Sequence, residues 1–173
     1  MTTAIHEKEA FETIVARHAS TVLRVCRAVV GATDADDAWS ETFLSALRAY
    51  PQLPADANIE AWLVTIAHRK AIDIIRKAAR QGIPVAEAPD RGATVVGATP
   101  EPALDGGLAH VLKALPTKQR HAVAYHYLAG LPYSEVAAIT GGTTDAVRRA
   151  AADGIASLRR IYPDLAALGR ETA

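Results

Sequence analysis

Apolar residues recur at intervals of three and four along most of the chain, which is the period of an amphipathic α-helix. Stretches that alternate apolar and polar residues, as a half-buried strand would, are almost absent. Start and stop signals divide the helical pattern into segments. We predict helices at residues 7–30, 34–50, 59–80, 104–114, 117–129, 133–140 and 144–161, and therefore an all-α fold.

Between residues 81 and 107 the pattern stops. This stretch reads QGIPVAEAPDRGATVVGATPEPALDGG, which is rich in Gly, Pro and Ala and short of large apolar side chains. Such a composition is typical of a flexible linker. The chain has 173 residues, 50% of them hydrophobic, so each side can bury a core. We expect two small helical domains, residues 1–80 and 108–173, joined by the linker 81–107.

The formal net charge is zero, but the charges are segmented along the chain. Residues 1–80 carry ten cations and ten anions, residues 81–107 one and four, and residues 108–173 eight and five. A zero total argues against a general coat for polyanions. Any surface that binds through charge must therefore be local.

The segment 59–80 separates into two faces when it is drawn as a helix. One face is apolar and is expected to be buried: Leu63, Val64, Ala67, Ala71, Ile74, Ile75 and Ala78. The other carries five cations, one acid and an indole: Trp62, Arg69, Lys70, Asp73, Arg76, Lys77 and Arg80. Asp73 is spaced to hold its cationic neighbours, and an indole among guanidinium groups can stack on an unpaired base, worth about 1 to 3 kcal/mol. This face indicates nucleic-acid binding, with a solvated face as the alternative.

The segment 34–50 begins with a capping signal, in which Thr33 caps and Asp36 reciprocates. We expect one face in the core: Trp39, Phe43, Ala46, Leu47 and Tyr50. The outer face carries Asp37, Glu41, Ser45 and Arg48. Asp37 and Glu41 repel each other at a spacing of four. A partner with cations would explain why the pair is tolerated, and a solvated stripe is the alternative.

Residues 133–161 have the layout of a helix-turn-helix. A short helix ends at Thr140, two glycines follow, and the polar residues Thr143, Thr144 and Asp145 open a longer helix. In such a motif the second helix lies in the major groove, with its first residues towards the bases. Similar patterns also occur in plain helical bundles.

Several functions are disfavoured. The single cysteine, Cys26, excludes an internal disulfide and is expected to fill the core. The histidines show no metal-ligand spacing, and His121 and His126 do not share a face. No nucleophile is paired with a base and no phosphate loop is present, so we expect neither an enzyme nor a cofactor. The polar start MTTAIHEKEA and the lack of a long apolar run predict a cytoplasmic protein without membrane insertion.

Three motifs in order resemble the extracytoplasmic-function group of the sigma-70 family, the promoter-recognition subunits of bacterial RNA polymerase. DADDAWSETFLSALRAY resembles the acidic helix of region 2, and AWLVTIAHRKAIDIIRKAAR resembles the DNA-binding helix of the same region. LKALPTKQRHAVAYHYLAGLPYSEVAAITGGTTDAVRRAAADGIASLRR resembles region 4. The resemblance implies a region 2 helical bundle and a region 4 helix-turn-helix, without catalytic chemistry.

The resemblance also implies partners and roles. The acidic helix would dock on the clamp coiled-coil of the polymerase core through Asp34, Asp36, Asp37, Glu41 and Thr42. The −10 promoter element would be bound and melted by Trp62, Arg69, Lys70, Asp73, Arg76, Lys77 and Arg80, with Asn58 reading a flipped base. The −35 element would be bound by Thr143, Thr144, Asp145, Arg148 and Arg149. An inhibitory anti-sigma factor is a further possible partner, and the acidic linker would run through the RNA path or serve as a solvated tether.

The last helix departs from the family pattern. Where the family continues with lysines and arginines, this chain has Ala150, Ala152, Asp153 and Ile155. Asp153 would repel a phosphate, so −35 binding is expected to be weak. This departure keeps an alternative open, namely a helix-turn-helix regulator or a polymerase-binding regulator that lacks full promoter recognition.

Overall fold

The computed structural model describes residues 8–82 and 106–163, and every regular element in these two ranges is helical. The seven predicted segments appear as α1 Phe11–Val30, α2 Ala32–Ala49, α3 Ile59–Arg80, α4 Gly106–Lys113, α5 Thr117–Val123, α6 Tyr133–Thr140 and α7 Thr144–Ile161. The prediction of an all-α fold is confirmed. Most of the linker lies outside the described residues, and so do its charged residues Glu87, Asp90, Arg91, Glu101 and Asp105.

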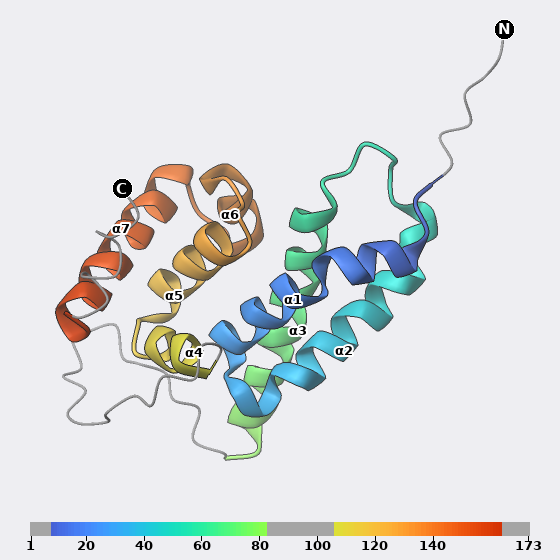
Figure 1. The fold of residues 1–173 in the computed structure, drawn as a ribbon. Coiled ribbons are helices and arrows are strands. Elements are labelled where there is room, and N and C mark those ends of the chain that lie inside the picture. Colours follow the sequence, from blue (N-terminus) through green and yellow to red (C-terminus); the bar gives the residue numbers. More distant parts are fainter. Residues whose placement is uncertain (1–7, 83–105, 164–173) are drawn as a thin grey trace, which may run out of the picture.

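The first domain is a bundle of α1, α2 and α3, each in contact with the other two (Figure 1). Its core includes Ile14, Val25, Leu63 and Val64, each at most 1% exposed. Burial of such side chains stabilises the bundle by about 1.5 to 3 kcal/mol each. The shared core fixes the outward faces of α2 and α3 relative to each other.

A single glycine, Gly31, joins α1 to α2. Its φ is 89°, a backbone conformation that is strained for a residue with a side chain. The abrupt turn therefore needs glycine here. The Lys113 ammonium group, from the second domain, also occupies the space that a Cβ on Gly31 would need. The turn makes Gly31 the N-cap of α2, which begins at Ala32, two residues before the predicted start at residue 34. The predicted capping by Thr33 and Asp36 is therefore wrong, because Thr33 lies inside the first turn.

Cys26, Leu47 and Trp39 were each expected in the core of the first domain. Cys26 is buried in the core, as predicted, and burial raises the pKa of its thiol to about 12. Leu47 was expected to be buried but is 52% exposed. The reason is its position at about 80° from Trp39 around the helix, at the edge of the apolar stripe. Trp39 itself is half-buried, and its Nε1 donates to the Ala19 carbonyl at 3.0 Å.

The second domain contains the predicted helix-turn-helix. The short helix α6 is followed by Gly141 and Gly142, which have φ values of 80° and 104°. Thr143 then caps α7, because its Oγ1 accepts a hydrogen bond from the Ala146 amide at 3.2 Å. The helix α5 packs along α7 and completes the three-helix unit.

A π-helical turn, η2 Ala124–Leu128, continues α5. Its backbone bonds span five residues, as in the 3.2 Å bond from the Ala129 amide to the Ala124 carbonyl. The sequence predicted one regular helix over 117–129, since a single extra residue in one turn leaves no clear mark on the apolar spacing. The turn leaves Tyr125 fully buried, while the His126 ring stacks on Tyr133 at 3.9 Å.

The two domains are packed against each other. Helix α4 and the turn η2 lie on α1, and α6 lies on α3 (Figure 1). The buried Arg120 crosses this contact and donates to the Val29 carbonyl of α1 at 3.4 Å. Asn58 Nδ2, at the start of α3, donates to the Glu135 carboxylate of α6 at 3.1 and 3.2 Å. The sequence had left this arrangement open.

Candidate functional surfaces

The acidic face of α2 points outwards. Asp36, Asp37 and Glu41 are exposed and Asp34 is partly exposed. Leu44 and Leu47, at 50% and 52% exposure, lie on the same side of the helix. Exposed leucines beside carboxylates are typical of a surface that docks on a protein. The sequence analysis missed Leu44, although its spacing of three from Glu41 could have identified it.

Thr42 does not belong to this surface. It is completely buried, and its Oγ1 donates to the Ala38 carbonyl at 2.6 Å. Its side chain points towards the core because residues 38 and 42 share one face of the helix, as spacing by four requires. The expectation that Thr42 contacts the polymerase is therefore corrected.

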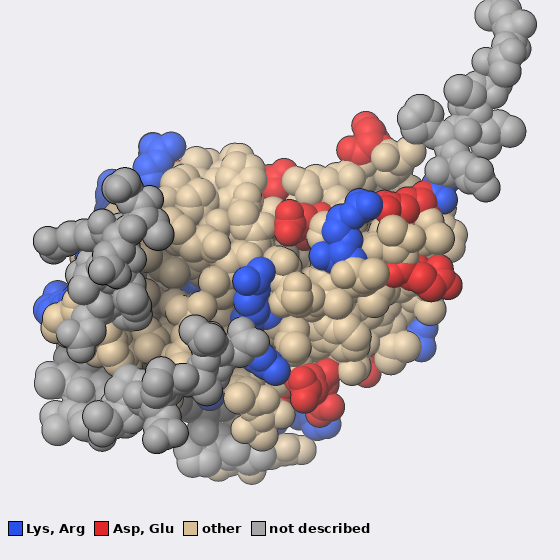
Figure 2. Space-filling view, viewed as in Figure 1, with Lys and Arg blue, Asp and Glu red and all other residues tan. Residues whose placement is uncertain are grey.

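An ion pair joins the acidic face of α2 to the basic face of α3. The Lys70 ammonium lies 3.6 Å from Glu41 Oε2, and the two side chains are 29% and 58% exposed. An exposed pair of this kind contributes only about 0 to 1 kcal/mol. A partner that binds Glu41 or Lys70 more strongly can therefore break this ion pair. Both signs are also present together on the face of the first domain shown in Figure 2.

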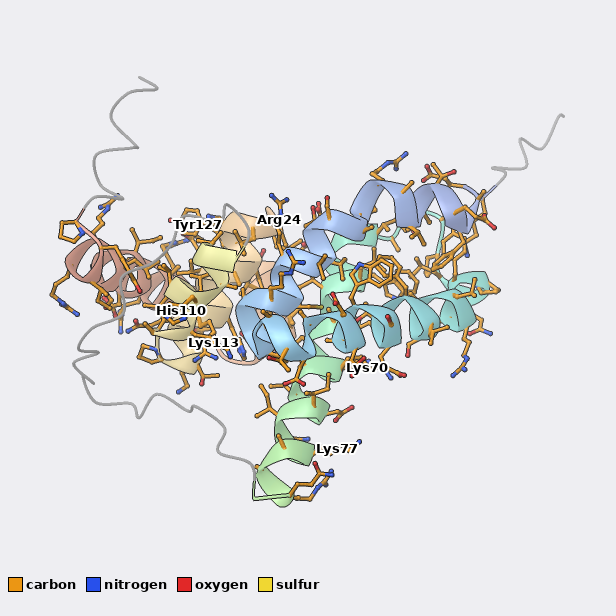
Figure 3. The ribbon with its side chains drawn as sticks, turned by 60° about the horizontal axis from the view of Figure 1, so that its bottom comes forward. Arg24, Lys70, Lys77, His110, Lys113 and Tyr127 are labelled. Carbon is orange, nitrogen blue, oxygen red and sulfur yellow. The ribbon has the colours of Figure 1, made fainter. Side chains whose placement is uncertain are left out.

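The basic face of α3 is most accessible at its C-terminal end. Arg69, Arg76, Lys77 and Arg80 are exposed, and the end that carries Lys77 projects beyond the other helices (Figure 3). Asp73 was expected to hold these cations, but within residues 8–82 it forms no ion pair with them. The cations are thus free of an acidic partner on their own helix. Groups so arranged can bind phosphates.

Trp62 differs from its expected position. Its indole is partly buried against the core, with its ring centroid 6.3 Å from that of Tyr50. The expected arrangement among the guanidinium groups is not seen, because Trp62 lies seven residues, about two turns, before Arg69 and its ring packs beside Tyr50 of η1 (Tyr50–Gln52). A partly exposed edge remains for stacking, while most of the ring contributes to the domain core.

Asn58 is the N-cap of α3. Its Oδ1 accepts from the Ala61 amide at 3.1 Å, while its Nδ2 donates to Glu135. Both ends of this side-chain amide are therefore engaged in the packed arrangement. A base edge would have to replace Glu135 to be read by Asn58.

The start of α7 presents the residues expected for the −35 element. Thr143, Asp145, Arg148 and Arg149 are exposed and Thr144 is partly exposed. Arg148 is held by Asp145 at 3.2 Å and lies 5.8 Å from the centre of the Tyr133 ring. Arg149 has no such neighbour among the described ion pairs. In the middle of the helix Ala152 and Asp153 are exposed, so the cation-poor stretch lies on the surface.

Comparisons with known proteins decide the family. The models of sigma-70 region 2 and sigma-70 region 4 match residues 14–81 and 106–158, in that order. The chain is 30% identical to the RNA polymerase sigma factor CarQ of Myxococcus xanthus over 162 residues, covering 91% of this chain and 92% of CarQ. The chain belongs to the extracytoplasmic-function sigma factors of the sigma-70 family. The two matched regions fall on the two packed domains.

Further sequence and structure matches of this sigma factor support the same family. It is 32% identical to the sigma factor SigD of Mycobacterium tuberculosis, covering 86% of this chain and 73% of SigD. Its fold matches the structure of CnrH in complex with the cytosolic domain of CnrY, with a TM-score of 0.63, 25% identity, and coverage of 89% and 88%. It also matches the sigma factor RpoE of Bartonella quintana in complex with the anti-sigma factor NepR, with a TM-score of 0.65, 21% identity, and coverage of 87% and 94%. None of the described helices of this chain has the length and apolarity needed to cross a bilayer.

Proposed function

We propose that this sigma factor divides promoter recognition between its two domains. Residues 1–80 bind core RNA polymerase and open the −10 element, residues 108–173 bind the −35 element, and the linker 81–107 sets their spacing. The observation that carries the proposal is the ordered match of regions 2 and 4 to the two domains. The protein works in the cytoplasm and has no catalytic activity of its own.

The clamp coiled-coil of the polymerase docks on the acidic face of α2. Asp34, Asp36, Asp37 and Glu41 supply the charge, and Leu44 adds exposed apolar area at the same surface. Cations of the clamp would relieve the repulsion between neighbouring carboxylates. In doing so they would release Lys70 from Glu41 and free it for DNA.

The −10 element lies along the basic face of α3. Arg69, Lys70, Arg76, Lys77 and Arg80 contact phosphates, and Asp73 orients a cation once DNA is bound. Trp62 and Asn58, at the N-terminal end of α3, meet the unpaired bases. Holding one base step open requires only a few kcal/mol of compensation. A few contacts of moderate strength are therefore sufficient.

The start of α7 binds the −35 element. Thr143, Thr144, Asp145, Arg148 and Arg149 lie at the end of the helix that a helix-turn-helix directs into the major groove. The exposed Ala152 and Asp153 offer no cation to the DNA, so the middle of α7 is expected to bind it weakly. Weak binding here would make promoter choice depend more on the first domain.

An anti-sigma factor is a further partner that we propose for this chain. The structures of CnrH and RpoE are complexes, with CnrY and with the anti-sigma factor NepR respectively. The similarity of fold supports a corresponding partner here.

The alternative function is a regulator that binds polymerase or DNA but does not recognise a full promoter. The cation-poor middle of α7 favours it. Removal of residues 108–173 separates the two functions. A sigma factor should lose upstream recognition, while a regulator that only binds the clamp should keep its effect on the polymerase.

Co-elution with bacterial core RNA polymerase tests the proposed function. The wild-type protein should co-elute, and Asp37→Arg/Glu41→Arg should abolish binding because it places cations against the clamp. Lys70→Ala is the matched control, since it removes the ion pair with Glu41 and leaves the acidic face intact. Absence of wild-type binding at low salt would contradict the sigma function and leave the helix-turn-helix as a separate DNA-binding module.

A further inference from the structure

The contact between the two domains contains a cluster of three polar rings to which the proposed function assigns no role. We call His68 of α3, His121 of α5 and Tyr125 of η2 the interdomain cluster. His68 Nδ1 and the Tyr125 hydroxyl are 2.7 Å apart, which makes a hydrogen bond from one domain to the other. The His121 ring stacks on Tyr125 at 5.5 Å with an interplanar angle of 12°. The His68 ring meets the His121 ring edge-on at 5.2 Å.

The cluster is built for neutral imidazoles. His121 is 6% exposed, and its Nε2 is buried without a hydrogen-bond partner. A proton on that nitrogen would find no acceptor in the packed arrangement. Burial, followed by the nearby His68 and Arg120, lowers the pKa of His121 to about 3. Burial, followed by the charge of Arg69, also lowers the pKa of His68.

Among the described residues, the charged groups that act on the two histidines are cations. On α5 the neighbouring charge is Arg120, a cation, and on α3 it is Arg69, another cation. The group on α1 that acts on Tyr125 is the thiol of Cys26. The carboxylate of α6, Glu135, is bonded to Asn58.

On the far side of α5, the helix α7 contributes Gly154, packed on Val123 and Gln119. A protonated His121 would therefore be repelled by Arg120, and the carboxylate of Glu135 on α6 is already hydrogen-bonded to Asn58.

We propose that the interdomain cluster is a proton-sensitive latch, which holds the two domains together when its histidines are neutral and releases them when protons bind. The closed arrangement is the one described above, with Tyr125 bonded to His68. In the open arrangement the domains separate, and both imidazoles reach water. The latch is a property of the free protein and does not depend on the assignment of the promoter-binding residues.

The sign of the pH dependence follows from the direction of the pKa shifts. Because both histidines have a lowered pKa when closed, the open arrangement binds more protons. The cluster stabilises closure fully above the ordinary histidine pKa of 6.5, and that contribution is lost as the pH falls towards the pKa of the closed form. For His121 alone, the ratio of open to closed molecules rises about tenfold between pH 7.5 and about pH 5.5. His68 adds to the change in the same direction.

Small-angle X-ray scattering of the full chain at these two pH values tests the latch, with circular dichroism to follow the helices. The wild-type radius of gyration should increase at the lower pH while the helical signal stays constant. His68→Gln/His121→Phe should stay compact at both values, because Phe retains the stacking on Tyr125 and Gln retains a hydrogen bond to it. His110→Gln is the control, since His110 is exposed on α4 (Figure 3) and should leave the wild-type response intact.

Three results would overturn the latch. The first is a wild-type radius that does not change with pH, and the second is a double variant that expands as the wild type does. The third is an expansion accompanied by loss of helix, which would indicate unfolding. His121→Phe alone provides a second measurement should the double variant be expanded at both values. In the His121→Phe variant, the rise of the open-to-closed ratio on lowering the pH should be about tenfold smaller than in the wild type. A rise as large as that of the wild type would also contradict the latch.

Discussion

Gly154 lies at a tight contact between α7 and α5. A Cβ added there would lie 2.8 Å from Cγ2 of Val123 and 3.4 Å from Cβ of Gln119. Valine is stiff at χ1 and cannot turn its methyl group away at low cost. Glycine in the middle of a helix is normally unfavourable by about 1 kcal/mol. At this position the close packing compensates for the weaker helix propensity.

We therefore expect Gly154→Ala to lower the free energy of unfolding by about 1 to 3 kcal/mol, because the overlap with Val123 outweighs the gain in helix propensity. Urea denaturation followed by circular dichroism measures the change. Asp153→Ala, at the exposed neighbouring position, is the control and should leave stability within about 0.5 kcal/mol. A more stable Gly154→Ala variant would show that α5 and α7 can move apart without cost.

Single residues also show where sequence patterns fail. The charged positions of the candidate surfaces, such as Asp37 and Arg76, are exposed as the helical period predicted. Leu47 was misplaced because it lies at the edge of the apolar stripe of α2. Thr42 was assigned to the outer face by resemblance, although its spacing of four from the buried Ala38 places it on the inner face. Trp62 was misplaced for another reason, since an amphipathic ring can turn its face to the core wherever a neighbour such as Tyr50 offers space.

At the scale of the element, α3 combines a buried half and a projecting half. Leu63, Val64, Ala67 and Ala71 are buried, whereas Ile74, Ile75 and Ala78 are only partly covered. The projecting end therefore presents Lys77 with little surrounding protein (Figure 3), and Arg76 next to it is exposed as well.

We expect Arg76→Ala/Lys77→Ala to abolish promoter opening and to leave the affinity for core polymerase unchanged, since the variant removes no carboxylate from the acidic face of α2. Permanganate reactivity of unpaired thymines measures opening, and co-elution measures polymerase binding. Arg17→Ala, an exposed cation of α1 paired with Glu9 at 2.6 Å, is the control and should permit opening. Loss of polymerase binding in the double variant would mean that the two faces have been assigned wrongly.

The helices themselves were largely predictable, because an amphipathic period and glycine stops recur along the chain. Ends differ by a few residues, as at α1, which begins at Phe11 rather than residue 7. The π turn η2 was not predicted, because one extra residue in a turn leaves no clear mark on the apolar spacing. The cap at Gly31 was missed because Thr33 and Asp36 offered the pattern of a capping pair. The turn places Tyr125 against α3, and the ammonium of Lys113 lies over Gly31.

At the scale of the whole molecule, the packing of the two domains joins residues that are far apart in the sequence. The hydrogen bond from Asn58 to Glu135 spans 77 positions, and that from Arg120 to Val29 spans 91. Neither hydrogen bond can be recognised from the local sequence, because each of these residues alone fits an ordinary position in its own helix. This is why the sequence predicted two domains but not their contact.

The even balance of charge over the whole chain also predicts how strongly the protein binds DNA on its own and within the polymerase complex. With a net charge of zero and its cations divided between α3 and α7, the isolated protein should bind duplex DNA poorly. Within the polymerase complex, the logarithm of promoter affinity should fall with the logarithm of salt concentration by about one unit per phosphate neutralised. Fluorescence anisotropy between about 50 and about 200 mM salt measures this slope. Tight binding of duplex by the isolated protein would contradict the division of the surfaces.

The buried Arg120 gives the two halves of the chain an order of assembly. Its guanidinium donates to the carbonyls of Lys113 and Leu115 within the second domain and to that of Val29 in the first. Synthesis begins at the N-terminus, and domains generally fold as they emerge from the ribosome. The helix that ends near Val29 is therefore complete before Arg120 is made. We therefore expect the first half of a nascent chain to fold before the second, and the second half to gain the hydrogen bond from Arg120 to Val29 only when the first is in place.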